Sequence, residues 1–206
     1  MARSLDFWFE FASTYSYPAA MRIAPLAAAA GVRVRWRPFL LGPIFKAQGW
    51  DTSPFNIFPE KGRYMWRDLE RLCRGLDLPF RRPELFPQNS LLAARVALVG
   101  LARDWGEQFC RAVFHAEFGE GRDIAETDVI AEILEHLGED ATAIMVAAQS
   151  PQSKNELRSQ TERARTLGIF GAPAFVTADG ELFWGNDRLE TAIAWARDAG
   201  DIRRSR

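Results

Sequence analysis

The segment Phe11 to Tyr17, FASTYSY, carries three hydroxyl side chains where an expected strand runs into an expected helix. These hydroxyls belong to Ser13, Thr14 and Ser16. A helix N-terminus presents unpaired backbone N–H groups and a partial positive charge, which stabilise an anion such as the thiolate of a ligand. A serine at this point can donate its O–H to the same anion. The alternative, which the spacing alone favours, is that Ser13 or Thr14 only caps the helix.

Two later motifs can serve an extended ligand. In GAPAF, Gly171 to Phe175, the proline directly precedes an expected strand. A cis bond before that proline would turn the Ala172 backbone outward to pair with a peptide-like ligand, whereas a trans proline would only close a loop. In FWGNDRLE, Phe183 to Glu190, Asn186 and Asp187 open the last helix. They are either ordinary caps or groups that bind both the ammonium and the carboxylate of an amino acid.

Lysines and histidines near the middle of the chain are weaker candidates. Lys46 and Lys61 can steady a carboxylate, although each lysine taken singly is more often a solvated surface residue. His115 and His136 are the only histidines, and they lie in helical patterns without partners at metal-ligand spacing. We therefore expect no metal site.

The composition is that of an ordinary soluble, globular protein. The 206 residues suffice for one core, with 48% hydrophobic and 26% charged residues. Because 26 basic residues are balanced by 27 acidic ones, neither nucleic acid nor a membrane is an expected partner. The N-terminal residues show no export signal, so we expect a cytoplasmic protein. Cys73 and Cys110 form no CxxC pair and are expected to be free, buried thiols.

The elements that position these motifs are expected in the order β-α-β, a helical block, then β-β-α. Strands over Leu5 to Phe11 and Val32 to Pro38 flank an alanine-rich helix that stops at Gly31, which is typical of a parallel pair. The many glycines and prolines of residues 40–59 predict an irregular segment. The remaining predictions are helices over residues 62–73, 90–105, 107–118, 128–137, 141–148 and 151–168, a hairpin over 174–184, and a last helix over 188–199.

The order and separation of these motifs resemble the 2-hydroxychromene-2-carboxylate isomerase family. The likeness extends to PEKGRYMWRDLER, Pro59 to Arg71, and to FGEGRDI, Phe118 to Ile124. This family lies in the thioredoxin-like superfamily, together with the kappa-class glutathione transferases and the bacterial disulfide oxidoreductases. The resemblance implies an α/β, thioredoxin-like fold with a large all-helical insertion. Residues 1–45 and 165–206 would form the discontinuous thioredoxin-like domain, and residues 46–164 the insertion.

The resemblance also implies a glutathione site, with Thr14 in place of the family's proline. Ser13 would hold the thiol sulfur. The backbone of Ala172, before a cis-proline, would pair with the cysteinyl part. The γ-glutamyl end would be held by Trp184, Gly185, Asn186 and Asp187.

An aromatic acid substrate would lie between the thioredoxin part and the helices. The resemblance places Lys46 near this substrate and makes Asn56 the nearest candidate for an asparagine that contacts it. Phe86 aligns with a family tyrosine, of which it keeps the ring and loses the hydroxyl. Asp51 and Thr52 stand where kappa-type transferases have an asparagine.

The implied reaction interconverts 2-hydroxychromene-2-carboxylate and trans-o-hydroxybenzylidenepyruvate during breakdown of naphthalene-type aromatics. Glutathione would act as a cofactor, through reversible conjugate addition of its thiolate, and the enzyme would be a homodimer. One alternative is a kappa-like glutathione transferase or peroxidase acting on another electrophile, and another is a non-catalytic glutathione-binding protein. Disulfide exchange is excluded, because it needs a protein thiolate that Ser13 and Ser16 do not offer.

Overall fold

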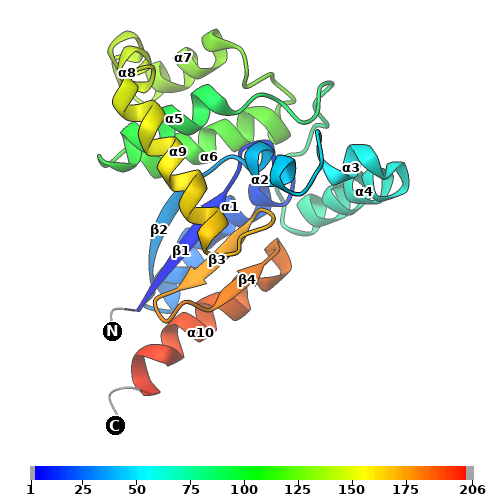
Figure 1. Ribbon diagram of the computed structural model, residues 1–206, viewed down its shortest axis with the longest axis vertical. Coiled ribbons are helices and arrows are strands. Elements are labelled where there is room, and N and C mark those ends of the chain that lie inside the picture. The colour runs from blue at the N-terminus through cyan, green and yellow to red at the C-terminus, as the bar shows by residue number, and fades with distance from the viewer. Residues whose placement is uncertain (1–2, 203–206) are drawn as a thin grey trace.

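A mixed four-stranded sheet with helices on both faces forms the centre of the computed structural model, which describes residues 3–202 (Figure 1). The strand order is β2-β1-β3-β4. β2 pairs with β1 in parallel, whereas β3 is antiparallel to both β1 and β4. This topology confirms the predicted β-α-β start and the late hairpin. The strands are β1 (Ser4–Phe9), β2 (Arg33–Pro38), β3 (Ala174–Thr177) and β4 (Leu182–Trp184).

The helices between β2 and β3 confirm the predicted helical insertion, while its exact boundaries at residues 46 and 164 stay a prediction. α1 (Ser16–Ala29) connects the two parallel strands, and α10 (Leu189–Ile202) follows the short 3-10 helix η2 (Asn186–Arg188). The helices between β2 and β3 are α2 (Leu41–Ala47), α3 (Pro54–Ile57), α4 (Pro59–Gly75), α5 (Leu91–Leu101), α6 (Gly106–Phe114), the π-helix η1 (His115–Gly119), α7 (Thr127–His136), α8 (Ala141–Ala148) and α9 (Pro151–Thr166).

The prediction that residues 40–59 are irregular is wrong, since α2 and α3 lie within them. Pro54 and Pro59 stand in the first turns of α3 and α4, where a missing N–H costs no helical hydrogen bond. The Ser53 hydroxyl caps α3 by accepting a hydrogen bond from the backbone N–H of Phe55 at 3.3 Å. The prolines therefore begin helices here, and the sequence pattern had suggested that they only interrupt them.

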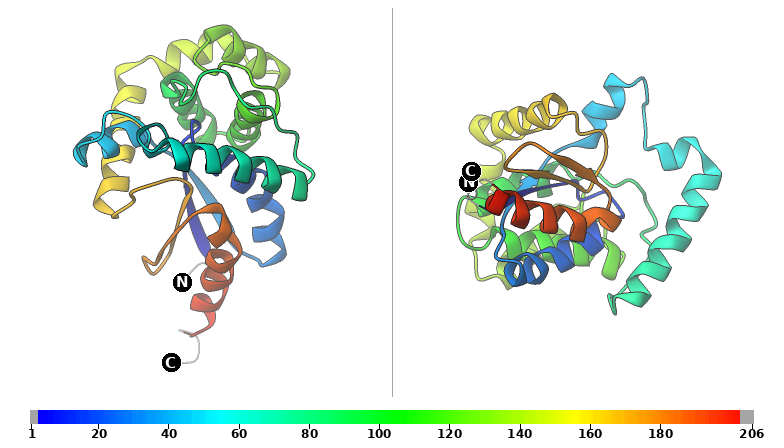
Figure 2. Two further views of the ribbon diagram at one scale, coloured as in Figure 1. Left: turned by 90° about the vertical axis from the view of Figure 1, so that its right-hand side faces the viewer. Right: turned by 90° about the horizontal axis from the view of Figure 1, so that it is seen from below.

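Helices cover both faces of β1, so the strand is buried along its whole length. Phe7 and Phe9 belong to a large apolar cluster that includes residues of α1, α5, α6 and α10, whereas Trp8 belongs to a smaller cluster with residues of α2 and α9. Figure 2 shows α1 and α10 on one side of the sheet and α9 on the other. Asp6 is buried on the strand and accepts ion pairs from Arg35 at 2.5 Å and Arg37 at 3.5 Å. Arg35 and Arg37 of β2 are thus paired with a buried carboxylate of β1.

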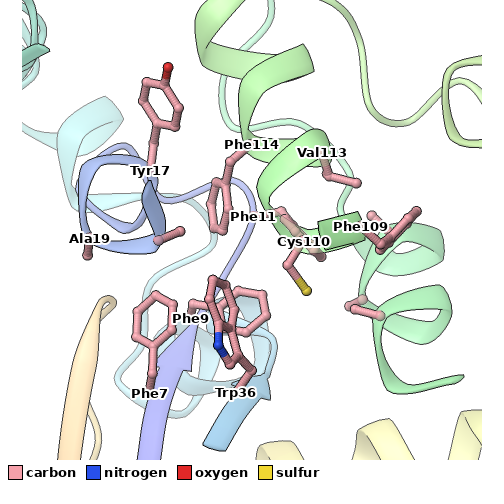
Figure 3. Packing of buried hydrophobic residues seen from close by; sticks show 14 of the residues in the cluster. Phe7, Phe9, Phe11, Tyr17, Ala19, Trp36, Phe109, Cys110, Val113 and Phe114 are labelled. Carbon is pink, nitrogen blue, oxygen red and sulfur yellow. The ribbon is translucent and has the colours of Figure 1, made fainter. Parts of the chain in front are cut away.

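Aromatic rings fix the end of β1 to the helical insertion (Figure 3). The ring of Phe11 lies 5.3 Å from that of Phe9 and 5.0 Å from that of Phe114 on α6. Such pairs bury large apolar areas in a defined geometry. The chain that enters the Ser13 segment is therefore held firmly against both parts of the protein.

The two cysteines are free and buried, as expected. Burial raises the pKa of the Cys73 thiol to about 11 and raises the pKa of the Cys110 thiol well above its ordinary value. Because the thiolate is the reactive form, both thiols are inert at neutral pH.

Candidate functional site

Ser13 lies in a turn between β1 and α1 and does not cap the helix. The N-cap of α1 is Tyr15, and no side chain makes a capping hydrogen bond there. Two overlapping turns precede the helix, with the Ser13 N–H donating to the Glu10 carbonyl at 3.1 Å and the Ser16 N–H donating to the Ser13 carbonyl at 3.0 Å. The prediction that Ser13 or Thr14 caps α1 is wrong, because these turns place the helix start beyond both residues. The Ser13 hydroxyl is consequently directed elsewhere.

The Ser13 hydroxyl donates a hydrogen bond of 2.9 Å to the carbonyl oxygen of Ala172. The Ala172–Pro173 peptide bond is cis, as the GAP motif suggested. The bond joins two motifs that lie 159 residues apart in the sequence. A serine hydroxyl has a single hydrogen. In this arrangement Ser13 can therefore accept a hydrogen bond from a neutral thiol, and it must turn away from Ala172 to donate to a thiolate.

The aromatic part of the WGND stretch lies beside the GAP motif. The Gly185 N–H donates to the Pro173 carbonyl at 2.9 Å. The ring of Trp184 is half exposed and lies 4.9 Å from that of Phe170. Gly171 leaves room for this indole, since a Cβ atom there would lie 2.5 Å from the Trp184 Nε1. These residues form one edge of the site next to the cis peptide.

The two polar residues of WGND differ in their surroundings. Asn186 is buried, and its Oδ1 accepts a hydrogen bond of 3.2 Å from Arg22 on α1. Arg22 also forms an ion pair with Glu190 on α10, and burial lowers its pKa. Asp187 is exposed and lies 3.4 Å from the Arg188 guanidinium. Asn186 therefore ties the turn to α1, whereas the Asp187 carboxylate lies at the surface beside Arg188.

The sequence analysis missed Arg22, although a signal was present. Arg22 is the only charged residue of α1, whose sequence SYPAAMRIAPLAAA is otherwise apolar or hydroxylated. A single guanidinium on a buried, alanine-rich helix requires a partner, because unpaired charge is costly to bury. The partners are the turn and the helix that follow β4.

The predicted substrate residues are brought together in part. The Asn56 side chain donates to the carbonyl of Phe86 at 3.4 Å and to the Thr52 hydroxyl at 3.1 Å. The ring of Phe86 packs edge-on against Trp66 of α4 at 4.8 Å. Lys46 is exposed in the last turn of α2. The structure thus joins Asn56 to Phe86, and the roles of all three predicted residues stay predictions.

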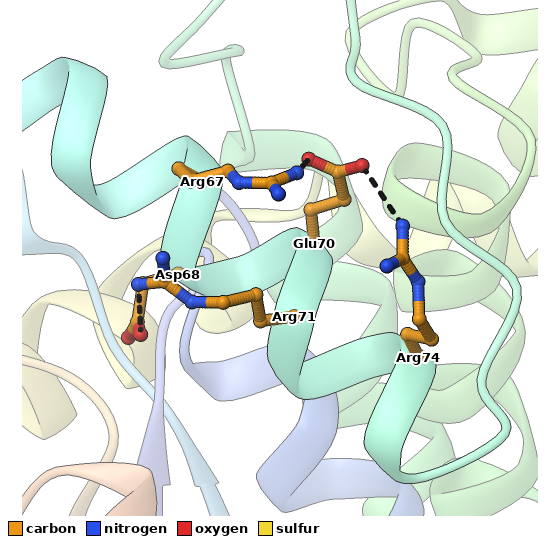
Figure 4. Close-up of polar contacts among 5 residues, drawn as sticks. All are labelled: Arg67, Asp68, Glu70, Arg71 and Arg74. Atoms are coloured by element: carbon orange, nitrogen blue, oxygen red, sulfur yellow. Dashed lines mark hydrogen bonds and ion pairs between the residues drawn. The ribbon is translucent and has the colours of Figure 1, made fainter.

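Helix α4 contacts the start of α1 next to Ser13. The Tyr15 hydroxyl donates to the Asp68 carboxylate at 2.9 Å. Burial and then this hydrogen bond raise the pKa of the Tyr15 phenol, which stays protonated. Most of the cations along α4 are neutralised within the helix (Figure 4). The drawn pairs are Arg71 with Asp68 at 3.1 Å, Arg67 with Glu70 at 2.6 Å and Arg74 with Glu70 at 3.3 Å.

Comparison with known proteins places the chain in a family. The model of the DSBA-like thioredoxin domain matches residues 4–193. A protein of Sphingobium xenophagum named 2-hydroxychromene-2-carboxylate isomerase is 32% identical over 200 residues, which span 96% of this chain and 100% of that protein. The chain belongs to the 2-hydroxychromene-2-carboxylate isomerase family. As a member of this family it is an enzyme, an isomerase, with a DsbA-like thioredoxin fold.

Two further comparisons agree with the isomerase family and with its neighbours. A solved structure of 2-hydroxychromene-2-carboxylate isomerase superposes with a TM-score of 0.84 at 29% identity, covering 97% of this chain and 98% of the other. Human glutathione S-transferase kappa 1 is 28% identical over 203 residues, covering 92% of this chain and 89% of that protein. The chain is thus related to isomerases and to transferases that are named for glutathione.

Among the side chains that the structure describes, no three of His, Cys, Asp or Glu are placed to hold a metal ion. No helix in the described part of the chain is long and apolar enough to cross a membrane. The groups near Ser13 and in the turn after β4 have the chemistry to contact a thiol peptide. They comprise a hydroxyl beside a cis peptide, an exposed indole and an exposed carboxylate.

Proposed function

We propose that this chain is a glutathione-dependent isomerase that interconverts 2-hydroxychromene-2-carboxylate and trans-o-hydroxybenzylidenepyruvate in the breakdown of naphthalene-type aromatics. The hydrogen bond between Ser13 and the Ala172 carbonyl carries this proposal. It places a hydroxyl donor directly beside the backbone that an extended peptide ligand can pair with. The names of the relatives, both isomerases and glutathione transferases, support the same cofactor and reaction.

The residues near the cis peptide bind the ends of the cofactor. The Ala172 backbone accepts the cysteinyl main chain in the manner of an added strand. Trp184 and Gly185 form the wall beside it. The Asp187 carboxylate holds the ammonium of the γ-glutamyl end, while Asn186 keeps the turn in place through Arg22.

Ser13 sets the protonation state of the cofactor. Glutathione held by Ser13 and the Ala172 backbone would supply a thiolate nucleophile for reversible conjugate addition to the opened substrate. A free thiol has a pKa of about 8.5, so only a small fraction is ionised at neutral pH. Ser13 raises that fraction by turning its O–H from the Ala172 carbonyl to the sulfur, since a donor stabilises the charged form. Ser13 is a donor and forms no covalent bond.

The opposite side of the site binds the aromatic acid. Lys46 neutralises the substrate carboxylate, and the rings of Phe86 and Trp66 contact its aromatic part. Asn56 uses both hydrogens of its amide on Phe86 and Thr52, so it contacts the ligand through its Oδ1, as an acceptor from the phenolic hydroxyl. This face consists of residues from α2, α3, α4 and the segment that precedes α5.

A kappa-like glutathione transferase is the second candidate, and the 28% identity to the human kappa enzyme favours it. The two reactions differ in their balance, because an isomerase regenerates glutathione and a transferase consumes it. We expect the purified protein to isomerise benzylidenepyruvate without loss of total glutathione. Stoichiometric consumption of glutathione with a halogenated aromatic, without isomerisation, would establish the transferase. Binding of glutathione without turnover of either compound would indicate a binding protein.

We also propose that the enzyme is a cytoplasmic homodimer. The buried free thiols Cys73 and Cys110 suit a reducing compartment. Exposed aromatic side chains such as Phe170 and Trp195 supply apolar surface for a second copy. Sedimentation equilibrium gives the mass in solution, and a monomer at all concentrations would contradict the dimer.

A further inference from the structure

We propose that Glu10 is a positioning residue that joins the Ser13 turn to the elements of the substrate face. The inference rests on the proposed function and adds to it a residue that touches neither ligand. Glu10 lies three residues before Ser13, and its side chain is only 6% exposed.

The two carboxylate oxygens of Glu10 bind two different elements. Oε2 accepts a hydrogen bond of 3.0 Å from the backbone N–H of Leu41, the first residue of α2. Oε1 accepts a hydrogen bond from the hydroxyl of Ser90, the N-cap residue of α5. The carbonyl of Glu10 accepts the Ser13 N–H at 3.1 Å. Glu10 therefore contacts the Ser13 turn, the first residue of α2, which carries Lys46, and the N-cap residue of α5.

The donors around Glu10 suit a carboxylate and not an amide. An ionised carboxyl accepts hydrogen bonds at both oxygens and donates none. Backbone N–H groups of Phe11 and Ala12 add to the stabilisation of the charged form, against the burial that raises its pKa. In Glu10→Gln the single amide oxygen can accept from only one of Leu41 and Ser90, so the Ser90 bond can persist only with the hydroxyl reversed as the acceptor. The substitution also removes the charge that strengthens both hydrogen bonds.

Glu117 on the π-helix η1 is the second buried carboxyl of this region and, in the part of the chain that the structure describes, lacks the hydrogen bonds that Glu10 has. It is fully buried, and neither of its oxygens has a hydrogen-bond partner among the described residues. Burial and the charges of Glu10 and Asp123 raise its pKa well above the ordinary value. Glu117 is consequently neutral, and replacement by glutamine conserves both its size and its charge. It provides the matched control for Glu10.

The experiment compares full-length Glu10→Gln, Ser90→Ala and Glu117→Gln with the parent protein. Three quantities are measured: glutathione affinity by calorimetry, kcat and KM for benzylidenepyruvate, and amide hydrogen exchange over residues 41–47. We expect Glu10→Gln to lower kcat/KM for the aromatic acid by about tenfold or more, the effect of losing a hydrogen bond to a charged group. Glutathione affinity stays unchanged, and exchange over α2 becomes faster.

The other variants separate positioning from a general effect on folding. Ser90→Ala lowers kcat/KM, and its effect does not add to that of Glu10→Gln, because both variants act on the same Glu10–Ser90 contact. Glu117→Gln leaves turnover and α2 exchange unchanged. If Glu10→Gln does not fold, Ser90→Ala provides the test.

Two results would overturn the inference. One is an unchanged kcat/KM with unchanged exchange over α2, and the other is an equal loss of glutathione affinity and turnover. A parent protein that turns over no benzylidenepyruvate would refute the proposed function instead. In that case the exchange over residues 41–47 still decides whether Glu10 holds α2.

Discussion

Replacing Ser13 by alanine removes the hydroxyl proposed to stabilise the glutathione thiolate. A hydrogen bond to a charged group contributes about 1.5–3 kcal/mol, whereas a neutral one contributes about 0.5–1.5 kcal/mol. When its hydroxyl turns from the Ala172 carbonyl to the thiolate, Ser13 loses a neutral hydrogen bond and gains one to a charged group. The net stabilisation of the thiolate is about 1–1.5 kcal/mol. Since one pKa unit corresponds to about 1.4 kcal/mol, the serine lowers the thiol pKa by about one unit.

The variant Ser13→Ala should therefore shift the ionisation of bound glutathione to higher pH. Ultraviolet absorbance of the thiolate, recorded against pH, gives the pKa directly, and the rising limb of kcat/KM against pH should move with it. At pH values below the thiol pKa of the parent protein, the variant should have about a tenfold smaller thiolate fraction than the parent, and its kcat/KM should be lower by the same factor. Above both pKa values the difference between variant and parent protein becomes small, because the thiol is ionised in each.

Ser16→Ala is the matched control. Its hydroxyl lies in the same segment, is buried, and has no hydrogen-bond partner within residues 3–202. We expect it to leave the thiol pKa unchanged. An unchanged pKa in Ser13→Ala, or a loss of activity of equal size at every pH, would refute the assignment of Ser13 as the thiolate donor.

Three further variants test the surroundings of the site. Arg22→Gln removes the charged donor to Asn186 and should lower the free energy of unfolding by about 1 kcal/mol, and weakened glutathione binding in calorimetry would show that the turn has moved. Gly171→Ala places a Cβ atom 2.5 Å from the Trp184 Nε1, so it should displace the indole and change both its fluorescence and the glutathione affinity. Burial raises the pKa of Glu117 in the folded state, so the folded protein keeps this proton at pH values where the unfolded chain has lost it. The free energy of unfolding should therefore fall as the pH rises above about 4.3, the pKa of an unperturbed glutamate. The slope is about 1.4 kcal/mol per pH unit until the folded-state pKa is reached. Glu117→Gln lacks this slope, and denaturant titrations at several pH values measure it; a parallel pH dependence in both proteins would contradict the raised pKa.

The sheet could be predicted from sequence because each strand carries its own local signal. Aromatic residues in β1, the alternation of arginine with apolar residues in β2 and the Asp-Gly turn before β4 depend on nearby residues alone. The joint presence of the three motifs also predicted the family. The short helix α3 and the first turn of α4 were hidden because a proline begins a helix as readily as it interrupts one.

Contacts between distant segments were beyond the sequence. The hydroxyl of Ser13 suggested a cap, and only the fold brings it to the Ala172 carbonyl, which lies 159 residues away. In the same way Asn186 suggested a cap or a ligand contact, whereas it binds Arg22 of α1. A polar residue at the start of a helix has several possible partners, and local pattern cannot choose among them.

Ser13 is proposed to hold the sulfur of a bound glutathione beside the Ala172 backbone. A crystal structure of the protein grown with glutathione would locate that sulfur. We expect it within hydrogen-bonding distance of the Ser13 Oγ, with the cysteinyl main chain paired to Ala172. Glutathione bound with its sulfur away from Ser13 would refute this role of the serine.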